Sequence, residues 1–226
     1  YAELGRRIRA VADGLRADGL TPGDRVLFSV RPGADAVVLA LGIVHAGGVV
    51  VFADPGAGEA LFRARAALAA PRYVAAESLL YLASSRPLRR LARRRGLELP
   101  PYATLVPDAR HVFAGPRLPG VPRGAIPLSS LLGPPRGSTG EGGPAGAETA
   151  GVGATAEALV IFTSGTTDAP KAVVHSRESL GAGLADFAAE VGIRPGLRVL
   201  TDQLMVGVPA LIAGAHWTIP PAGVDP

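Results

Sequence analysis

Nine consecutive residues combine hydroxyl groups, a glycine and a lysine directly after an apolar stretch. The segment Thr163 to Lys171 reads TSGTTDAPK and contains four hydroxyl side chains together with Gly165 and Lys171. Hydroxyls and consecutive backbone N–H groups can surround phosphate oxygens, glycine allows close backbone approach, and lysine supplies a mobile positive charge. The segment therefore predicts a polyphosphate-binding site.

Lysine use along the chain supports this interpretation. Of the 23 basic residues, Lys171 is the only lysine, and all the others are arginines. The segment differs from a Walker A loop, in which Ser or Thr follows Gly-Lys, because Lys171 lies between Pro170 and Ala172. It also lacks the G-x-G-x-x-G of dinucleotide-binding proteins. On the residues alone, the alternative is an ordinary turn rich in Ser, Thr and Pro.

The elements around this segment follow a regular order. Apolar runs with turn residues between them predict strands that alternate with amphipathic helices, joined by short connections. This order predicts an α/β fold, a parallel β-sheet with helices on both faces, in which ligands bind beyond the carboxyl ends of the strands. The predicted strands are 25–30, 49–53, 72–76, 159–162 and 173–175, and the predicted helices are 4–15, 34–46, 59–69, 79–94 and 177–191.

The composition changes between the two parts of this pattern. The stretch Gly133 to Thr155 is rich in Gly, Pro, Ser and Thr and has almost nothing to bury, so it predicts a flexible connection. We therefore divide the chain into a first βαβ subdomain (1–113), a Gly/Pro-rich connection (114–157) and a phosphate-loop segment (158–226). A loop is expected over 163–172, and Ser176 is the expected N-cap of the last helix.

Charge and composition exclude several classes of protein. With 48% hydrophobic and 19% charged residues, the chain is too apolar to be disordered. The absence of Cys excludes disulfides and thiolate metal sites and fits a cytoplasmic location. The apolar run Ala36 to Ala53 contains His45 and is split by Gly47-Gly48, which favours a buried helix followed by a buried strand over a membrane span.

The net charge of +4 and the pI of about 10.1 raise the alternative of a nucleic-acid binder. Nucleic-acid surfaces usually interleave basic residues with aromatic ones, and the densest basic cluster of this chain has none. A solvated helix C-terminus, where arginines complement the helix dipole, explains the cluster better. The cluster comprises Arg86, Arg89, Arg90, Arg93, Arg94 and Arg95.

The segment Thr163 to Lys171 resembles the signature TSGTTGxPKG of the adenylate-forming (AMP-binding) superfamily, which includes acyl-CoA synthetases, nonribosomal adenylation domains and luciferases. Three upstream elements resemble the same superfamily in the same order: YAEL at residues 1–4, PGDRV at 22–26, and HAGGVVVFADP at 45–55. The resemblance covers residues 1 to about 200. It implies part of the large N-terminal domain of an adenylate-forming ligase.

The resemblance implies a two-step reaction in which ATP, with Mg²⁺, activates a carboxylic acid to an acyl-adenylate and releases pyrophosphate. A nucleophile, often the thiol of CoA or of a carrier protein, then accepts the acyl group. The signature would hold the β- and γ-phosphates of ATP. The residues that match the family's motif and would bind the nucleotide are Thr163, Ser164, Gly165, Thr166, Thr167 and Lys171.

Two positions depart from the signature. Asp168 replaces a glycine, and its carboxylate would repel a polyphosphate unless Mg²⁺ intervenes, whereas Ala172 replaces the glycine after the lysine. These departures leave a second alternative, a non-catalytic relic or binding module with the same fold. The chain begins with Tyr1 and lacks the family's later motifs, so we expect a fragment of a longer protein that is inactive alone.

Further expectations concern the substrate and single residues. The residues after Asp54-Pro55-Gly56 resemble fatty-acyl ligases and β-lactone synthetases, which implies a fatty-acyl or polyketide-like acid. The segment 201–207 falls where the family builds part of its acyl pocket. His175 and His216 are expected to be solvated or satisfied, and Trp217 and Met205 to be core residues. No residues have metal-cage spacing, so Mg²⁺ would come with ATP.

Overall fold

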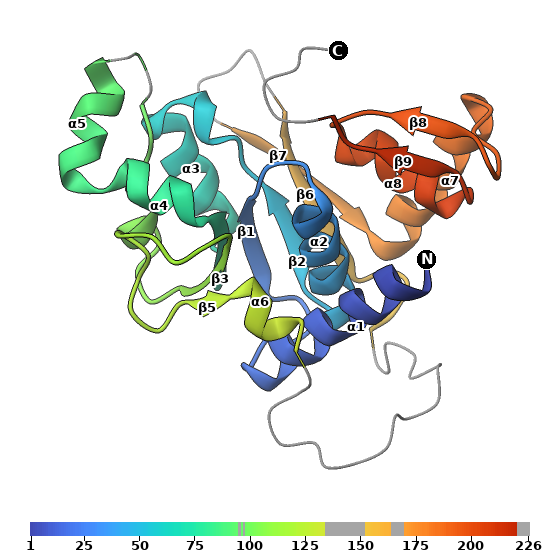
Figure 1. The fold of residues 1–226 in the computed structure, drawn as a ribbon, viewed down its shortest axis with the longest axis horizontal. Coiled ribbons are helices and arrows are strands. Elements are labelled where there is room, and N and C mark those ends of the chain that lie inside the picture. The colour runs from blue at the N-terminus through green and yellow to red at the C-terminus, as the bar shows by residue number, and fades with distance from the viewer. Residues whose placement is uncertain (95, 97, 134–151, 164–169, 221–226) are drawn as a thin grey trace.

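The computed structural model describes residues 1–94, 96, 98–133, 152–163 and 170–220. A seven-stranded sheet in the order β5-β4-β3-β1-β2-β6-β7 forms its centre (Figure 1), and every pairing is parallel except β6 with β7. The strands are β1 (Arg25–Ser29), β2 (Val49–Phe52), β3 (Tyr73–Glu77), β4 (Arg110–Ala114), β5 (Ile126–Pro127), β6 (Glu157–Thr163) and β7 (Lys171–Ser176).

Helices cover both faces of this sheet, as the sequence predicts. On one face, α1 (Ala2–Ala17), α2 (Ala34–Ala46) and α6 (Leu128–Leu131) pack on alternate strand residues such as Phe28 and Val50. On the other face, α3 (Glu59–Ala69), α4 (Ser78–Ser84) and the short 3-10 helix η2 (Tyr102–Thr104) pack on residues such as Leu27 and Val51. Strands buried on both faces read as continuous apolar runs, which explains why β1 and β2 are evident in the sequence.

The predicted helix 79–94 is wrong as a single element. The structure has α4 (Ser78–Ser84) and a separate helix α5 (Arg86–Arg94), with Ser85 extended between them at φ −64° and ψ 149°. Pro87 has no N–H with which to continue the hydrogen bonding of α4. The hydroxyls of Ser84 and Ser85 also donate to the carbonyls of Tyr81 and Leu82, which competes with helical hydrogen bonding.

The stretch predicted as a connection contains structure near its start. β5 and α6 lie within it, with Leu128 and Leu131 buried in the core, whereas residues 134–151 lie outside the described part. The remaining elements are the 3-10 helix η1 (Pro55–Ala57), α7 (Arg177–Glu190), β8 (Arg198–Leu200), α8 (Leu204–Ile212) and β9 (His216–Thr218). β8 and β9 form a small parallel sheet of their own.

Helix α7 begins as predicted. The hydroxyl of Ser176 accepts a hydrogen bond from the backbone N–H of Ser179 at 3.1 Å, which is the expected N-cap. The loop predicted over 163–172 is shorter than expected, since Thr163 ends β6 and Lys171 begins β7. Among the described residues, no helix combines the length and apolar character needed to cross a membrane.

Candidate functional site

The two ends of the signature segment face each other across a hairpin. Thr163 is the last residue of β6, Lys171 is the first residue of β7, and the two are partners in the antiparallel register. Both are exposed. A hydroxyl and an ammonium group therefore lie together at the end of the hairpin, where both can donate to an anion. Four predicted site residues lie outside the described part: Ser164, Gly165, Thr166 and Thr167.

Strand β6 is fixed along its length, and this holds Thr163 in place. It pairs with β2, with Val50 opposite Leu159, and the ring of its Phe162 is buried. The guanidinium carbon of Arg65, on α3, lies 5.5 Å from the centroid of that ring, within cation–π range. The end of β6 that carries Thr163 is thus packed against the body of the sheet.

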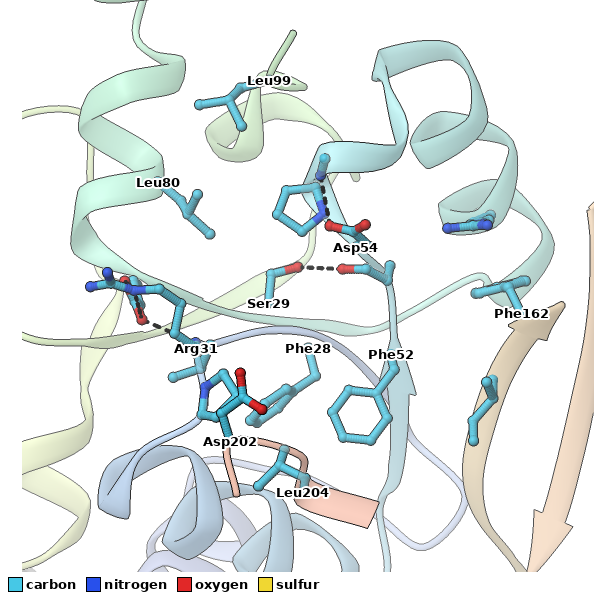
Figure 2. A pocket seen from close by; sticks show the side chains of 18 of the residues that line it. Phe28, Ser29, Arg31, Phe52, Asp54, Leu80, Leu99, Phe162, Asp202 and Leu204 are labelled. Carbon is cyan, nitrogen blue, oxygen red and sulfur yellow. Dashed lines mark hydrogen bonds and ion pairs between the residues drawn. The ribbon is translucent and has the colours of Figure 1, made fainter. Parts of the chain in front are cut away.

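A cavity of about 880 Å³ opens at the carboxyl ends of β1, β2, β3 and β6 (Figure 2). These strands occupy the centre of the sheet. β2 lies on one side of β1 and β3 on the other, so the direction in which successive strands are added to the sheet reverses after β2. Ligands of open α/β sheets bind at such a reversal. The apolar walls of the cavity include Phe28, Phe52, Leu80, Leu99, Phe162 and Leu204.

Polar groups enter the cavity from the strand ends. The hydroxyl of Ser29 donates to the carbonyl of Ala53 at 3.1 Å, and a carboxylate oxygen of Asp54 accepts from the N–H of Gly56 at 2.8 Å. Figure 2 shows both contacts at the end of β2. They fix the turn that leads into α3, which carries Arg65.

An ion pair bridges the point where the sheet reverses. The Nε atom of Arg31 donates to both carboxylate oxygens of Glu77, at 2.9 and 2.8 Å, and its backbone N–H donates to one of them. These hydrogen bonds raise the pKa of Arg31 above its ordinary value. Because they join the residues after β1 to the end of β3, they hold together two walls of the cavity.

Two further charged residues reach the cavity from distant elements. The buried Nε atom of Arg65 has no hydrogen-bond partner within the described part of the chain. Asp202 comes from the turn before α8, and Figure 2 places it beside Leu204, below Arg31. Nothing in the local sequence marks Ser29, Glu77 or Arg65 as site residues, although the strand–helix alternation predicts a site at the strand ends.

The segment 201–207, expected to build part of an acyl pocket, lines this cavity through Asp202, Gln203, Leu204 and Met205. Met205 is 40% exposed and is therefore a cavity residue, which corrects its prediction as core. Trp217 packs against a small apolar cluster, and its Nε1 donates to the carbonyl of Thr201 at 2.8 Å, as expected of a core residue.

The two histidines singled out in the sequence differ in exposure. His216 is exposed, and His175 is half-buried on β7. No group of three or more His, Cys, Asp or Glu side chains able to hold a metal ion occurs in the part of the chain that the structure describes.

Comparison with known proteins identifies the fold and the family. The sequence model of the AMP-binding enzyme family matches residues 1–222. Olefin beta-lactone synthetase of Xanthomonas campestris pv. campestris is 31% identical over 177 residues, which is 77% of this chain and 27% of that protein. Tenellin synthetase of Beauveria bassiana is 27% identical over 204 residues, which is 90% of this chain and 4% of that protein. The chain thus spans 27% or less of these relatives.

Solved structures agree on the fold. An anthranilate CoA ligase in complex with anthranoyl-AMP superposes with a TM-score of 0.71 at 18% identity, over 98% of this chain and 39% of that one. Acetoacetyl-CoA synthetase from Streptomyces lividans gives 0.71 at 22% identity, over 96% and 32%. The N-terminal subdomain of NpsA from Klebsiella oxytoca gives 0.62 at 18%, over 100% and 49%. The predicted fold, a mostly parallel sheet with helices as in the N-terminal domain of adenylate-forming ligases, is confirmed.

Proposed function

We propose that this chain, which belongs to the family of AMP-binding enzymes, is part of a ligase that activates a carboxylic acid with ATP. A carboxylate oxygen would attack the α-phosphorus of ATP, the bond from that phosphorus to the bridging oxygen would break, and pyrophosphate would leave. The products are an acyl-adenylate and pyrophosphate. The observation that carries this proposal is the pairing of Thr163 with Lys171 at the two ends of TSGTTDAPK.

The signature residues would act on the leaving pyrophosphate. The ammonium group of Lys171 and the hydroxyl of Thr163 would donate to its oxygens and stabilise the charge that develops there. Ser164, Thr166 and Thr167 are proposed to donate further hydrogen bonds, and Gly165 to allow close approach of the backbone. Mg²⁺ bound with ATP would neutralise part of the phosphate charge.

The cavity at the strand ends is the proposed place for the acid. Its walls are mainly apolar side chains, which suits an acid with a fatty-acyl or polyketide-like chain. The similarity to olefin beta-lactone synthetase supports an acid of this kind. The acyl acceptor is proposed to be the thiol of CoA or of a carrier protein, and the cysteine-free sequence supports a cytoplasmic location.

Exchange of labelled pyrophosphate into ATP, driven by a panel of fatty acids, tests the proposal on the full-length protein. We expect exchange with medium- or long-chain acids and a loss of about 100-fold or more in Lys171→Ala, since a charge donor to the transition state is removed. Arg198→Ala, at an exposed position on β8, is the matched control and should retain full exchange. If no acid supports exchange by the folded protein, the ligase proposal fails.

A non-catalytic binding module of the same fold is the second candidate. Asp168 and Ala172, in place of the two glycines of the signature, favour it. Titration with Mg·ATP and the variant Asp168→Gly distinguish the two. A binding module would bind the nucleotide without exchange, and Asp168→Gly would restore exchange if the carboxylate is the cause of the loss.

A further inference from the structure

Helix α5 has all its basic residues on one side. Its sequence, RPLRRLARR, contains five arginines and two leucines and lacks any acidic residue. At 3.6 residues per turn, the five arginines fall within an arc of about 140°, and Leu88 and Leu91 lie opposite them. The helix is therefore strongly amphipathic.

The orientation of α5 is the reverse of that of an ordinary surface helix. Arg89 and Arg93 point to the body of the protein, where both bind the carboxylate of Glu59 on α3. Leu88 and Leu91 are instead 37% and 47% exposed. Amphipathic helices of globular proteins normally place the apolar side on the core. In α5 the apolar side faces outward, and Figure 1 shows the helix at the outer edge of the molecule, far from α7 and α8.

The charge around α5 is also unbalanced. Among the described residues, Glu59 is the one carboxylate that pairs with Arg63, Arg89 and Arg93. Burial alone would raise the pKa of Glu59, but the hydrogen bonds from Arg89 and Arg63 outweigh burial and lower it. The other three arginines of the helix are exposed and form no ion pair with any described residue: Arg86, Arg90 and Arg94.

The exposed arginines lie beside the exposed leucines. Arg86, Arg90 and Arg94 follow one another at intervals of four residues, so they form a single row along the helix. Leu91 and Arg94 are three residues apart and are therefore neighbours on the helix surface. An apolar strip bordered by a row of positive charges fits a partner with an apolar layer beneath an anionic layer.

We propose that α5 docks on the surface of an anionic lipid bilayer. Leu88 and Leu91 enter the boundary between headgroups and acyl chains, and Arg86, Arg90 and Arg94 bind the lipid phosphates. A nucleic acid fits less well, because α5 offers no aromatic side chain for stacking and its leucines would remain unburied. The proposal concerns attachment of the protein to a membrane surface and does not depend on its catalytic activity.

The position of α5 links this surface to the cavity. Nε of Arg89 donates to the carbonyl of Leu99 at 3.0 Å, and Leu99 lines the cavity, as do Leu79 and Leu80 of the preceding helix α4. A docked α5 would hold this cavity wall close to the bilayer. That consequence, a route for apolar acids from the membrane, rests on the proposed function, whereas docking itself does not.

Co-sedimentation of the full-length protein with vesicles tests the proposal. Vesicles of phosphatidylglycerol and phosphatidylcholine are compared with vesicles of phosphatidylcholine alone, with inorganic phosphate present in one arm. We expect binding to the anionic vesicles only, reduced about 25-fold by Arg86→Gln with Arg90→Gln, because each arginine near the surface contributes about a factor of five. Leu88→Ser with Leu91→Ser should also weaken binding.

The matched control is Arg194→Gln with Arg198→Gln, which removes the same charge at two exposed positions outside α5. It should bind like the unaltered protein, and circular dichroism must show that all variants are folded. The proposal would be overturned if the protein did not bind anionic vesicles or bound neutral ones equally well. Equal losses of binding in the control and α5 variants would also overturn it. So would loss of binding in millimolar free phosphate at constant ionic strength. Binding to duplex DNA without binding to vesicles would also overturn it and favour a nucleic acid as partner.

Discussion

The helices α2 and α7 are of similar length but differ in how much of each is buried. α2 buries seven of its residues between α1 and the sheet, whereas α7 buries only Ala188. Phe187, in the last turn of α7, and Val191, its C-cap residue, are 38% and 59% exposed. The strands differ in the same way, since β2 is buried and most of β7 is exposed.

The signature segment lies on the border between these two regions. It is joined on one side to β6, whose residues enter both apolar cores, and on the other to β7, where Val173 and Val174 are 41% and 46% exposed. Thr163 is thus fixed by packing, whereas Lys171 is fixed mainly by its backbone pairing with Thr163. Of the residues proposed to bind phosphate, Thr163 is therefore expected to be held more firmly than Lys171.

The largest expected difference in the free energy of unfolding is between a charge placed on the buried side of this border and the same charge placed on the exposed side. Val160 and Val174 are partners across the hairpin, but Val160 is 2% exposed and Val174 is 46% exposed. Val160→Asp should lower the free energy of unfolding by about 3 kcal/mol or more, because it buries an unpaired charge. Val174→Asp should change it by less than about 0.5 kcal/mol. Urea unfolding measures both, and equal losses would refute the contrast.

A smaller change in stability is expected when a methyl group is added to one glycine in α2 and to one in α7. A Cβ atom at Gly42 of α2 would lie 2.5 Å from Cγ1 of Val11, so Gly42→Ala should destabilise by about 1–3 kcal/mol through overpacking. Gly181 of α7 has open space at this position, and Gly181→Ala should stabilise by about 0.5–1 kcal/mol through helix propensity. Thermal unfolding of the two variants should shift in opposite directions. A loss of stability in both would show that α7 is packed like α2.

The ion pair at the start of β6 should contribute less to the free energy of unfolding than the changes expected from the valine and glycine substitutions. Nε and Nη2 of Arg25 donate to both carboxylate oxygens of Glu157, at 2.8–3.2 Å, and the side chains are 30% and 40% exposed. Because solvent screens the pair, a double-mutant cycle with Arg25→Ala and Glu157→Ala should give a coupling of about 1 kcal/mol. The same cycle for the exposed pair Arg6 and Glu3 should give a coupling near zero. A larger coupling in the exposed pair would contradict the role of burial.

The smallest effect is a dependence of stability on pH. Burial lowers the pKa of His111, whose Nδ1 lies 2.9 Å from the hydroxyl of Tyr81. The unfolded chain therefore takes up a proton near its ordinary pKa of about 6.5 before the folded protein does, so stability is lost as pH falls below that value. His111→Phe should flatten the slope of unfolding free energy between pH 7 and 5. A slope in His111→Phe equal to that of the unaltered protein would contradict this prediction.

The parts of the fold that the sequence predicts are those with strong local signals. The bounds of α2 and α3 match the prediction because strong signals mark their ends. Gly33 and Gly47 flank α2, with Gly47 at φ 98°, whereas Gly58 precedes α3 and Pro71 follows its C-cap. β4 begins with Arg-His, and β5 is a two-residue strand held by pairing of Pro127 with Phe113, so neither has a periodic pattern to detect. Their existence depends on partners that are distant in the sequence.

The candidate site, like the fold, has one part with a local sequence signal and one part without. TSGTTDAPK is recognisable because its residue types lie next to one another, and the structure places both of its ends in one hairpin. The cavity could not be predicted residue by residue, since Ser29, Arg65 and Asp202 come from elements far apart in the chain. They are brought together by the packing of strands and helices in the whole fold rather than by any local pattern.

The parallel pairing of Val50 with Leu159 has a consequence for how the molecule assembles. Closing so long a segment of chain costs conformational entropy before the pairing returns any stabilisation, so such contacts form slowly. Strands β1, β2 and β3 lie close together in the sequence and can pair first, giving β6 an edge on which to dock. We therefore expect the signature segment to acquire its geometry in a late folding step, after the hydrophobic centre of the sheet has formed.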